Sequence, residues 1–543
     1  MNDATRRAMN ALQGWVEPNW REFRRERQPF VLILALAIGL GAGVAAILFR
    51  ELIGFAQFFW LGTRSEQTLT AAAAMPWWVI LLGPIGGGLV VGLMLRRISA
   101  RRAGGVADVI EARAYTGRKL SVSDGLWSAL VSGISVGTGA SAGREGPIVH
   151  LGAMLGGVIS RRAALPEWCR RTLLSAGVAS AVAASFNAPF AGVLFAHEVV
   201  LGHYALRSFV PIMIASTAGS VLSRLWFGPD ASFSVPAYAV ASYWEFPAFV
   251  LLGLVCAAVA ILFQLALFIA DFAARRIDMP LWLRPAAGGV MVGAIGVFFP
   301  HVLGVGYEVT DLALSGQLPL LLALALIVLK TVATAISLAA RFGGGVFAPA
   351  MVVGALTGSA FGLMASSVFP DMASSGGLYA MLGMGAVAGA VFGAPISTAM
   401  IVFELTGGYA LAIALLLTVA VAQGAIQALH GHSWFQWQLR MRGLDVREGP
   451  HKPLGASVQV MDFMEPLAAD AEPVTYDPER GVPALKPTDT LDSALRLLDQ
   501  GGHDRLPVIS PSDTTRVIAW ASHVAALRHF NRALVQASVE EHR

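Results

Sequence analysis

Charged residues are scarce in this chain, and cysteine is almost absent. Only 14% of its 543 residues are Asp, Glu, Lys or Arg, while 55% are hydrophobic and the mean hydropathy is +0.63. So low a charge density excludes an ordinary soluble protein and offers no basic surface for a nucleic acid. Two cysteines, Cys169 and Cys256, are too few for a disulfide framework or a metal site. We therefore expect a membrane protein without metal or cofactor.

The hydrophobic residues form runs of the length that a lipid bilayer requires, which is about 20 residues for a helix. Clear examples are residues 30–49, 248–269 and 320–340. Other runs are broken by Gly and Pro, and most of the 58 glycines lie inside the runs. Small residues let membrane helices approach closely, and they also mark interrupted helices. The sequence thus predicts an all-α polytopic membrane protein, packed within the bilayer.

No apolar stretch precedes the first long run, so the pattern of a cleavable signal peptide is absent. We interpret residues 1–28, with Trp15 and Trp20, as a cytoplasmic amphipathic segment. Residues 29–440 form the predicted transmembrane domain, and residues 441–543 form a cytoplasmic tail. By the positive-inside rule the Arg clusters are cytoplasmic, and they lie at residues 21–27, 96–102, 161–171, 275–276 and 440–442. The predicted location is a bacterial-type inner (plasma) membrane, crossed several times, with both termini in the cytoplasm.

The predicted transmembrane domain contains an internal repeat. Each member of one set returns 202 positions later: Gly143, Pro147 and Gly152 as Gly345, Pro349 and Gly354. Each member of a second set returns 206 positions later: Phe186, Pro189 and Glu198 as Phe392, Pro395 and Glu404. Two homologous halves, at about residues 30–225 and 246–430, account for both offsets.

The halves differ in the charge of one equivalent link. In the first half the link carries four arginines, Arg161, Arg162, Arg170 and Arg171. In the second half the link at residues 366–377 has no basic residue and one acidic residue, Asp371. Under the positive-inside rule the first link faces the cytoplasm and the second faces outside. The halves are therefore predicted to be inverted, which places a substrate site near the middle of the membrane.

Each half opens one apolar helix with glycines followed by a proline. The first motif is Gly143-Arg144-Glu145-Gly146-Pro147, and the second is GGGVFAP at residues 343–349. Unpaired amides at a helix start attract an anion without any cationic side chain. An acidic side chain there mimics an anion, so Glu145 would occupy the site when deprotonated and leave it when protonated or displaced. The alternative is that both motifs are only helix caps with packing glycines.

These motifs, together with the stretch from Phe186 to Glu198, resemble the signature motifs of the CLC family of chloride channels and H+/Cl− antiporters. The resemblance implies a homodimer with one anion pathway per subunit, and two inverted halves with broken and tilted helices. It implies that Glu145 is the gate and that backbone amides line the anion sites at Arg144, Glu145, Gly146, Val346 and Phe347. The implied cargo is chloride or a similar small anion, and the implied role is transport rather than catalysis.

Three positions depart from the pattern of that family. At the family's central serine the chain has Gly104, and at its pathway tyrosine the chain has Phe435, so both usual hydroxyls at the central anion site are missing. We expect a looser site there, which Gly104→Ser combined with Phe435→Tyr would tighten. The third departure is Val199, which stands where proton-coupled members often carry an internal glutamate.

The missing glutamate bears on whether anion flow is coupled to protons. His197 and Glu198 lie beside Val199, and the three residues form the candidate proton path. Passive, channel-like conduction is favoured by a small margin over secondary-active H+/Cl− exchange. Glu198 matches Glu404 in the repeat, and a carboxylate at a helix end or an interface is the simpler interpretation of both.

A membrane enzyme is a remote alternative. Residues 139–143 match the G-x-S-x-G pattern of a nucleophile elbow around Ser141, but that elbow needs a strand, which this apolar context does not predict. His197-Glu198 also begins an H-E-x-x-H zinc motif, but Leu201 stands where the second histidine is needed.

The tail is predicted to be a small α+β module. Residues 488–533 resemble the second half of a CBS domain pair, a cytoplasmic regulatory module, and residues 458–466 resemble an eroded remnant of the first half. The acidic residue that would hold a ribose is missing near Ala525. We therefore expect a dimerisation or packing element rather than a nucleotide-binding site.

Overall fold

The computed structural model describes residues 16–18, 20–21, 23–24, 27–115, 118–228, 233, 240, 242–370, 373–407, 411–444, 454–455, 458–467, 474–477 and 482–542. Most of the expected amphipathic segment 1–28, as well as Asp371, lies outside the described residues. The chain divides into two compact units. Residues 1–109 with 120–434 form the first unit, and residues 110–119 with 435–543 form the second.

The first unit is helical, and its helices fall into two successive sets, one for each predicted repeat half. The first set is α2 (Gln28–Leu61), α3 (Thr68–Ala73), α4 (Trp77–Met94), α5 (Val106–Ala114), α6 (Val122–Gly137), α7 (Glu145–Arg162), α8 (Glu167–Phe186), α9 (Pro189–Phe195) and α10 (Leu206–Phe227). A 3-10 turn, η1 (Leu95–Arg97), extends α4, and a π-helical turn, η2 (Ala196–Leu201), extends α9. The last residues of α5 belong to the second unit.

The second set follows the same order. It consists of α11 (Phe246–Arg276), α12 (Arg284–Phe298), α13 (Tyr307–Leu314), α14 (Leu320–Ala339), α15 (Phe347–Val368), α16 (Gly376–Phe392), α17 (Pro395–Thr406) and α18 (Ala412–Leu429), with 3-10 turns η3 (Tyr243–Glu245) and η4 (Pro300–Val302). Across the described residues, seven helices are long and apolar enough to cross a membrane. Others are shorter, such as α9 and α17, so the membrane unit contains the short helices that the interrupted runs predict.

Helix boundaries in the two sets follow the same local chemistry. The C-cap residues are Asn187 for α8 and Gly393 for α16, and both adopt the left-handed conformation, with φ of 56° and 66°. Asn and Gly are the residues that tolerate this conformation at a helix end. The next helices, α9 and α17, then begin with Pro189 and Pro395 at their first position.

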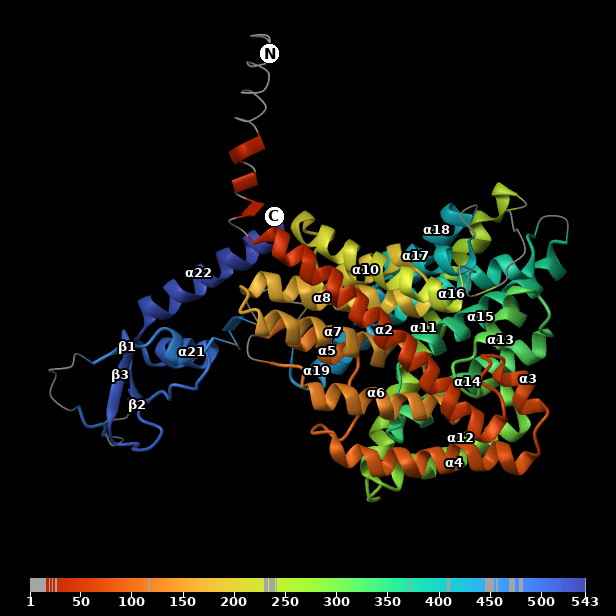
Figure 1. Cartoon of the computed structure of the whole chain (residues 1–543), viewed down its shortest axis with the longest axis horizontal. Coiled ribbons are helices and arrows are strands. Elements are labelled where there is room, and N and C mark those ends of the chain that lie inside the picture. The colour runs from red at the N-terminus through yellow and green to blue at the C-terminus, as the bar shows by residue number, and fades with distance from the viewer. Residues whose placement is uncertain are drawn as a thin grey trace, which may run out of the picture. The chain divides into compact units, whose positions relative to one another are not determined.

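Contacts between the two halves are reciprocal. Glu198 accepts a hydrogen bond from the amide of Ser397 at 2.7 Å, and its repeat partner Glu404 accepts one from the amide of Ala191 at 2.7 Å. The helices α4 and α12 lie side by side (Figure 1). A contact that is repeated with the partners exchanged is what a two-fold axis produces. The two halves are therefore related by an approximate two-fold axis.

Within each half, two helices touch through their backbones at glycine. A Cβ added to Gly177 in α8 would lie 2.0 Å from the carbonyl oxygen of Gly152 in α7. In the second half a Cβ added to Gly383 in α16 would lie 2.4 Å from the carbonyl oxygen of Gly354 in α15. Figure 1 shows α7 beside α8 along their length. The repeated glycines therefore set the distance between each of these helix pairs.

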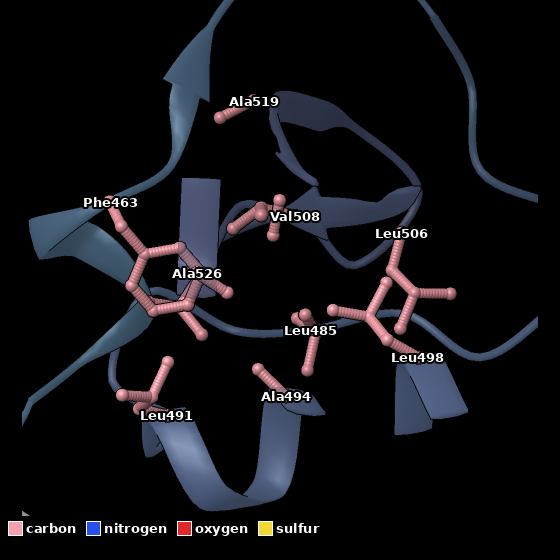
Figure 2. Close-up of a cluster of buried hydrophobic side chains, with 11 residues drawn as sticks. Phe463, Leu485, Leu491, Ala494, Leu498, Leu506, Val508, Ala519 and Ala526 are labelled. Carbon is pink, nitrogen blue, oxygen red and sulfur yellow. The ribbon is translucent and has the colours of Figure 1, made fainter. Parts of the chain in front are cut away.

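The second unit contains a small antiparallel sheet with helices. Its elements are α19 (Trp434–Arg440), η6 (Val460–Asp462), β1 (Glu465–Pro466), α21 (Leu491–Gly501), β2 (Arg505–Ile509), β3 (Val517–Ser522) and α22 (His523–His542), and the strand order is β1-β3-β2. Figure 2 shows how Leu491, Ala494 and Leu498 on α21 point toward Val508 on β2. These buried side chains form one hydrophobic core, so the predicted α+β character of the tail is confirmed.

We expect Gly177→Ala and Gly383→Ala each to lower the stability of the membrane unit by roughly 1–3 kcal/mol, because the added methyl group forces the packed helices apart. The measurement is the midpoint of thermal unfolding of the purified protein in detergent. Gly86→Ala in α4 is the matched control, because a Cβ at Gly86 meets nothing within 4 Å. Equal midpoints for all three variants would contradict the packing role of the repeated glycines.

Candidate functional site

The two glycine and proline motifs meet at one point in the membrane unit. Gly143 and Gly345 exchange two backbone hydrogen bonds, each with an N···O distance of 2.7 Å. Their helices begin two residues further on, at Glu145 in α7 and at Phe347 in α15. A Cβ added to Gly345 would lie 3.0 Å from the nitrogen of Gly146. Two helix starts, one from each repeat half, are therefore adjacent.

Both helix starts lack a side-chain cap. Arg144 and Val346 hold the N-cap positions, and neither side chain accepts a hydrogen bond from its helix. The first amides of a helix carry partial positive charge and have no acceptor within the helix. One of them, the amide of Ala348 in α15, donates to Oε2 of Glu145 at 3.3 Å. An acidic side chain of the first half thus caps the helix of the second half.

Glu145 is buried, with only 3% of its surface exposed. Its second partner is Tyr307 at the start of α13, whose hydroxyl donates to Oε1 of Glu145 at 3.3 Å. A Cβ at Gly143 would lie 2.3 Å from Oε2 of Glu145, so glycine is needed there to leave room for the carboxylate. The sequence analysis missed Tyr307. Its only sequence signal is the two nearby glycines, Gly304 and Gly306, which adopt positive φ and turn the chain toward α13.

Arg144 is held by partners other than the Glu145 carboxylate. Its guanidinium donates to Oε1 of Glu66 at 2.5 Å and to the carbonyl of Ser185 at 3.0 Å. It also lies over the ring of Tyr307, 4.8 Å from the ring centroid. Glu66 pairs with Arg50 as well, at 2.8 Å. The Arg144 side chain therefore braces the loop before α7. Sequence analysis missed Glu66, because a single carboxylate in a polar loop carries no motif signal.

Aromatic rings fix the first residue of α15. The ring of Phe347 stacks on Phe392 with a centroid distance of 4.6 Å, and it also contacts Phe186 at 5.2 Å and Phe195 at 6.1 Å. Phe186 and Phe392 are equivalent positions of the repeat. Each half thus contributes a phenylalanine that packs against the same helix start, and the apolar rings surround the amides near Phe347.

Gly104 lies against a histidine that the sequence analysis did not consider. Its amide donates to Oγ of Ser128 at 3.0 Å. A Cβ added to Gly104 would lie 2.6 Å from Nε2 of His150 in α7. His150 is 5% exposed, and its Nδ1 atom has no hydrogen-bond partner in the described part of the chain. The imidazole thus occupies the space beside Gly104 into which a serine side chain would extend.

The residues of the candidate proton path lie in η2, the π-helical turn that extends α9. Glu198 accepts hydrogen bonds from the amides of Ile396 and Ser397, so it lies at the start of α17. His197 is fully buried, and its Nδ1 lies 2.9 Å from the carbonyl oxygen of His203. Its Nε2 has no partner among the described residues. Val199 is half-buried in η2. The structure therefore leaves His197, rather than Glu198, with a free ring nitrogen.

The structure also places Phe435 and Ser141, the other residues that the sequence pointed to. Phe435 belongs to the second unit, where it is a buried residue of α19. Oγ of Ser141 lies 3.1 Å from Oγ1 of Thr334, and the amide of Ser141 donates to Ser337, so this serine is part of helix packing. Among the residues that the structure describes, no group of three or more His, Cys, Asp or Glu is placed to hold a metal ion.

Comparisons with known proteins agree with this geometry. The family model described as voltage gated chloride channel matches residues 87–427. A ClcB-like chloride channel protein of Ralstonia nicotianae is 34% identical over 394 residues, which cover 71% of this chain and 91% of the relative. The H+/Cl− exchange transporter ClcA of Cronobacter sakazakii is 30% identical over 419 residues, which cover 75% of this chain and 89% of the relative.

A solved structure shares the fold. The crystal structure of a slow cyanobacterial Cl−/H+ antiporter matches with a TM-score of 0.68 and 21% sequence identity, and the match covers 77% of this chain and 99% of that chain. At this identity the likeness shows the fold alone. The predicted fold class, a helical membrane protein of two inverted halves with broken helices, is confirmed.

The contact between Gly104 and His150 changes the expected effect of restoring the serine. We expect Gly104→Ser alone to lower the thermal midpoint and to leave chloride binding no tighter, because the new side chain collides with the imidazole. His150→Ala should offset part of that loss when the two changes are combined, with a coupling of about 1 kcal/mol. A double-mutant cycle of thermal unfolding, with calorimetry of chloride binding, measures both effects. Purely additive losses would contradict the contact.

Proposed function

The chain belongs to the family of voltage gated chloride channels, and from this premise we propose that it carries chloride or a similar small anion across the membrane, with Glu145 as the gate of the pathway. The observation that supports this most directly is the contact between the Glu145 carboxylate and the amide of Ala348. A helix start with an uncapped first turn is a site for an anion. Here the carboxylate takes the position of that anion.

The Glu145 carboxylate is held loosely, as a gate must be. Its hydrogen bonds from Ala348 and from Tyr307 each have a length of 3.3 Å. Strong hydrogen bonds to a carboxylate are shorter, at about 2.7–2.9 Å for a nitrogen donor. A protonated or displaced Glu145 loses little when it leaves, and the amide it vacates becomes available to the anion. Anion binding at the gate is therefore in competition with the carboxylate.

Backbone amides form the proposed anion site. They belong to Arg144, Glu145, Gly146, Val346 and Phe347, at the adjacent starts of α7 and α15. Amides at a helix start attract an anion through partial charges rather than through a full positive charge. Conduction needs binding that is strong enough for the ion to enter and weak enough for it to leave. Amides without a cationic ligand suit this requirement.

Passive, channel-like conduction is favoured by a small margin over H+/Cl− exchange. Val199 cannot carry a proton, and Glu198 is engaged by two amides of α17. The free Nε2 of His197 supports the alternative, because a proton could pass through it. The chain resembles relatives of both kinds: one is named a chloride channel protein and the other an H+/Cl− exchange transporter. Enzymatic activity has no support from the surroundings of Ser141.

The assembly and location follow from the same premise. We propose a homodimer with one pathway in each subunit, in an inner membrane of bacterial type, with both termini in the cytoplasm. The arginines at residues 21–27 precede α2, which supports a cytoplasmic N-terminus. The tail has the order β1, α21, β2, β3, α22 of the proposed CBS-like module. With Ala525 where an acidic residue would hold a ribose, we propose a packing role for it and no nucleotide.

The gate assignment predicts how flux depends on pH. In the parent protein we expect anion flux to rise as the pH falls, because protonation removes the competing carboxylate. Glu145→Gln should keep the flux and abolish this dependence. The measurement is chloride efflux from proteoliposomes between about pH 4.5 and pH 7.5, a range around the usual carboxyl titration. Glu404→Gln is the matched control, since Glu404 also caps a helix start, that of α9. Acid activation that survives in Glu145→Gln would refute the gate.

The choice between channel and exchanger has its own test. Proteoliposomes receive a chloride gradient at zero pH gradient, with the membrane potential clamped by a potassium ionophore. Passive conduction predicts chloride movement without proton movement. Uphill proton movement that disappears in Glu145→Gln would establish exchange, and its loss in His197→Gln as well would assign the proton path to His197.

A further inference from the structure

A cavity of about 260 Å³ is lined in part by Tyr307 and Arg144. Its walls come from the first unit: the second half of α2, the loop before α3 and the start of α3, the ends of α6 and α10, the loop before α13 with its first residue, and the N-cap residue of α7. Tyr307, which donates to Glu145, is one of the lining residues. Tyr307 therefore lies between the cavity and the Glu145 carboxylate.

Positive charge exceeds negative charge in the lining of this cavity. Three arginines, Arg50, Arg64 and Arg144, face two carboxylates, Glu51 and Glu66. Glu51 accepts a hydrogen bond from the indole of Trp226 at 3.1 Å. Arg64 lies over the ring of Phe55 and, among the described residues, forms no ion pair with a carboxylate.

Glu66 lies between two of these arginines. Its Oε1 atom is 2.5 Å from Nη1 of Arg144 and 2.8 Å from Nε of Arg50. The two cations have other supports that hold them in place. Arg144 is also bonded to the carbonyl of Ser185, and the guanidinium of Arg50 lies 3.8 Å from the centroid of the Phe227 ring. The two guanidinium groups would therefore stay close together without Glu66.

The carboxylate is the more exposed partner in this arrangement. Glu66 is on the loop between α2 and α3, and its side chain is 41% exposed, whereas that of Arg144 is 4% exposed. Solvent reaches Glu66, and salt screens its attraction to the two arginines. A small anion from solution can therefore compete with Glu66 for the two guanidinium groups, which together offer several N–H donors.

We propose that this cavity is a second anion site, in which the Glu66 carboxylate holds the position between Arg50 and Arg144 that a small inorganic anion takes when Glu66 moves away. That the bound anion is chloride or a similar ion rests on the proposed function. The basic residues before α2 place the far end of this helix, and the cavity with it, on the outer side of the membrane. An anion bound there lies next to Tyr307, on the outer side of Glu145 along the proposed pathway.

The test uses the full-length protein and chloride as the probe. Glu66→Gln keeps the length of the side chain and one acceptor oxygen but removes the competing charge. We expect it to lower the half-saturating chloride concentration for uptake into proteoliposomes roughly two- to fivefold, the range that one weak ion pair corresponds to. Calorimetry in detergent should show the same shift. The difference should shrink at high concentrations of a salt with an impermeant anion.

Glu51→Gln is the matched control, because it removes the same charge from the same cavity at a residue that bridges no arginines. We expect its half-saturating concentration to stay near that of the parent. An equal shift in both variants would show a general electrostatic field and overturn the proposal, as would parent-like behaviour of Glu66→Gln. Arg50→Gln is a second variant, for which weaker chloride binding is expected; unchanged binding would also overturn the site.

Failure of this proposal is distinguishable from failure of the proposed function. If the chain carries no chloride, the parent shows no flux and Glu145→Gln has no effect. If only the second site is wrong, the parent transports normally and Glu66→Gln matches it. We also expect the shift from Glu66→Gln to persist in the Glu145→Gln background, because the two carboxylates occupy different positions; its disappearance there would contradict a separate site.

Discussion

The two hydrogen bonds between Gly143 and Gly345 hold the starts of α7 and α15 against each other inside the membrane unit. A helix start normally turns its unpaired amides toward water or a capping side chain. In a membrane interior an unpaired amide is costly, so each needs an acceptor. Gly143 and Gly345 pair with each other, and the amide of Ala348, further along α15, pairs with the Glu145 carboxylate. The candidate site is a direct consequence of that requirement.

Carboxylates from distant segments cap other helix starts in this fold, and the comparison shows what is special about Glu145. Glu308 caps α3 at 2.8 Å, and Glu198 and Glu404 cap α17 and α9 with closest distances of 2.7 Å. Glu145 caps α15 at 3.3 Å, although it is more deeply buried. A short bond fixes a helix end, whereas a long one is easily exchanged for a different acceptor. The three short contacts suit structural roles, and the long contact suits a gate.

The repeat made much of this architecture predictable from sequence. Equal spacing of glycines and prolines in two halves implies equivalent helices, and the reciprocal contacts of Glu198 and Glu404 are what such equivalence produces. Side-chain partners from unrelated segments were not predictable. Tyr307, Glu66 and His150 carry no local pattern, and each matters only because the fold brings it to a residue far away in the chain. The missing hydroxyl at Gly104 predicted a looser anion site, but the sequence did not reveal that the imidazole of His150 from α7 lies against this glycine.

Arg144 precedes Glu145 in the chain and pairs with Glu66, so its charge is engaged away from the proposed gate. A free guanidinium next to the amides of α7 would bind chloride tightly and slow its release. Glu66, the carbonyl of Ser185 and the ring of Tyr307 occupy the guanidinium instead. The same contacts hold the guanidinium at the cavity, where we propose that it attracts an anion. In the proposed pathway, anion attraction at the cavity and anion passage at Glu145 are therefore separate, and Arg144 can lie beside Glu145 without binding the anion there.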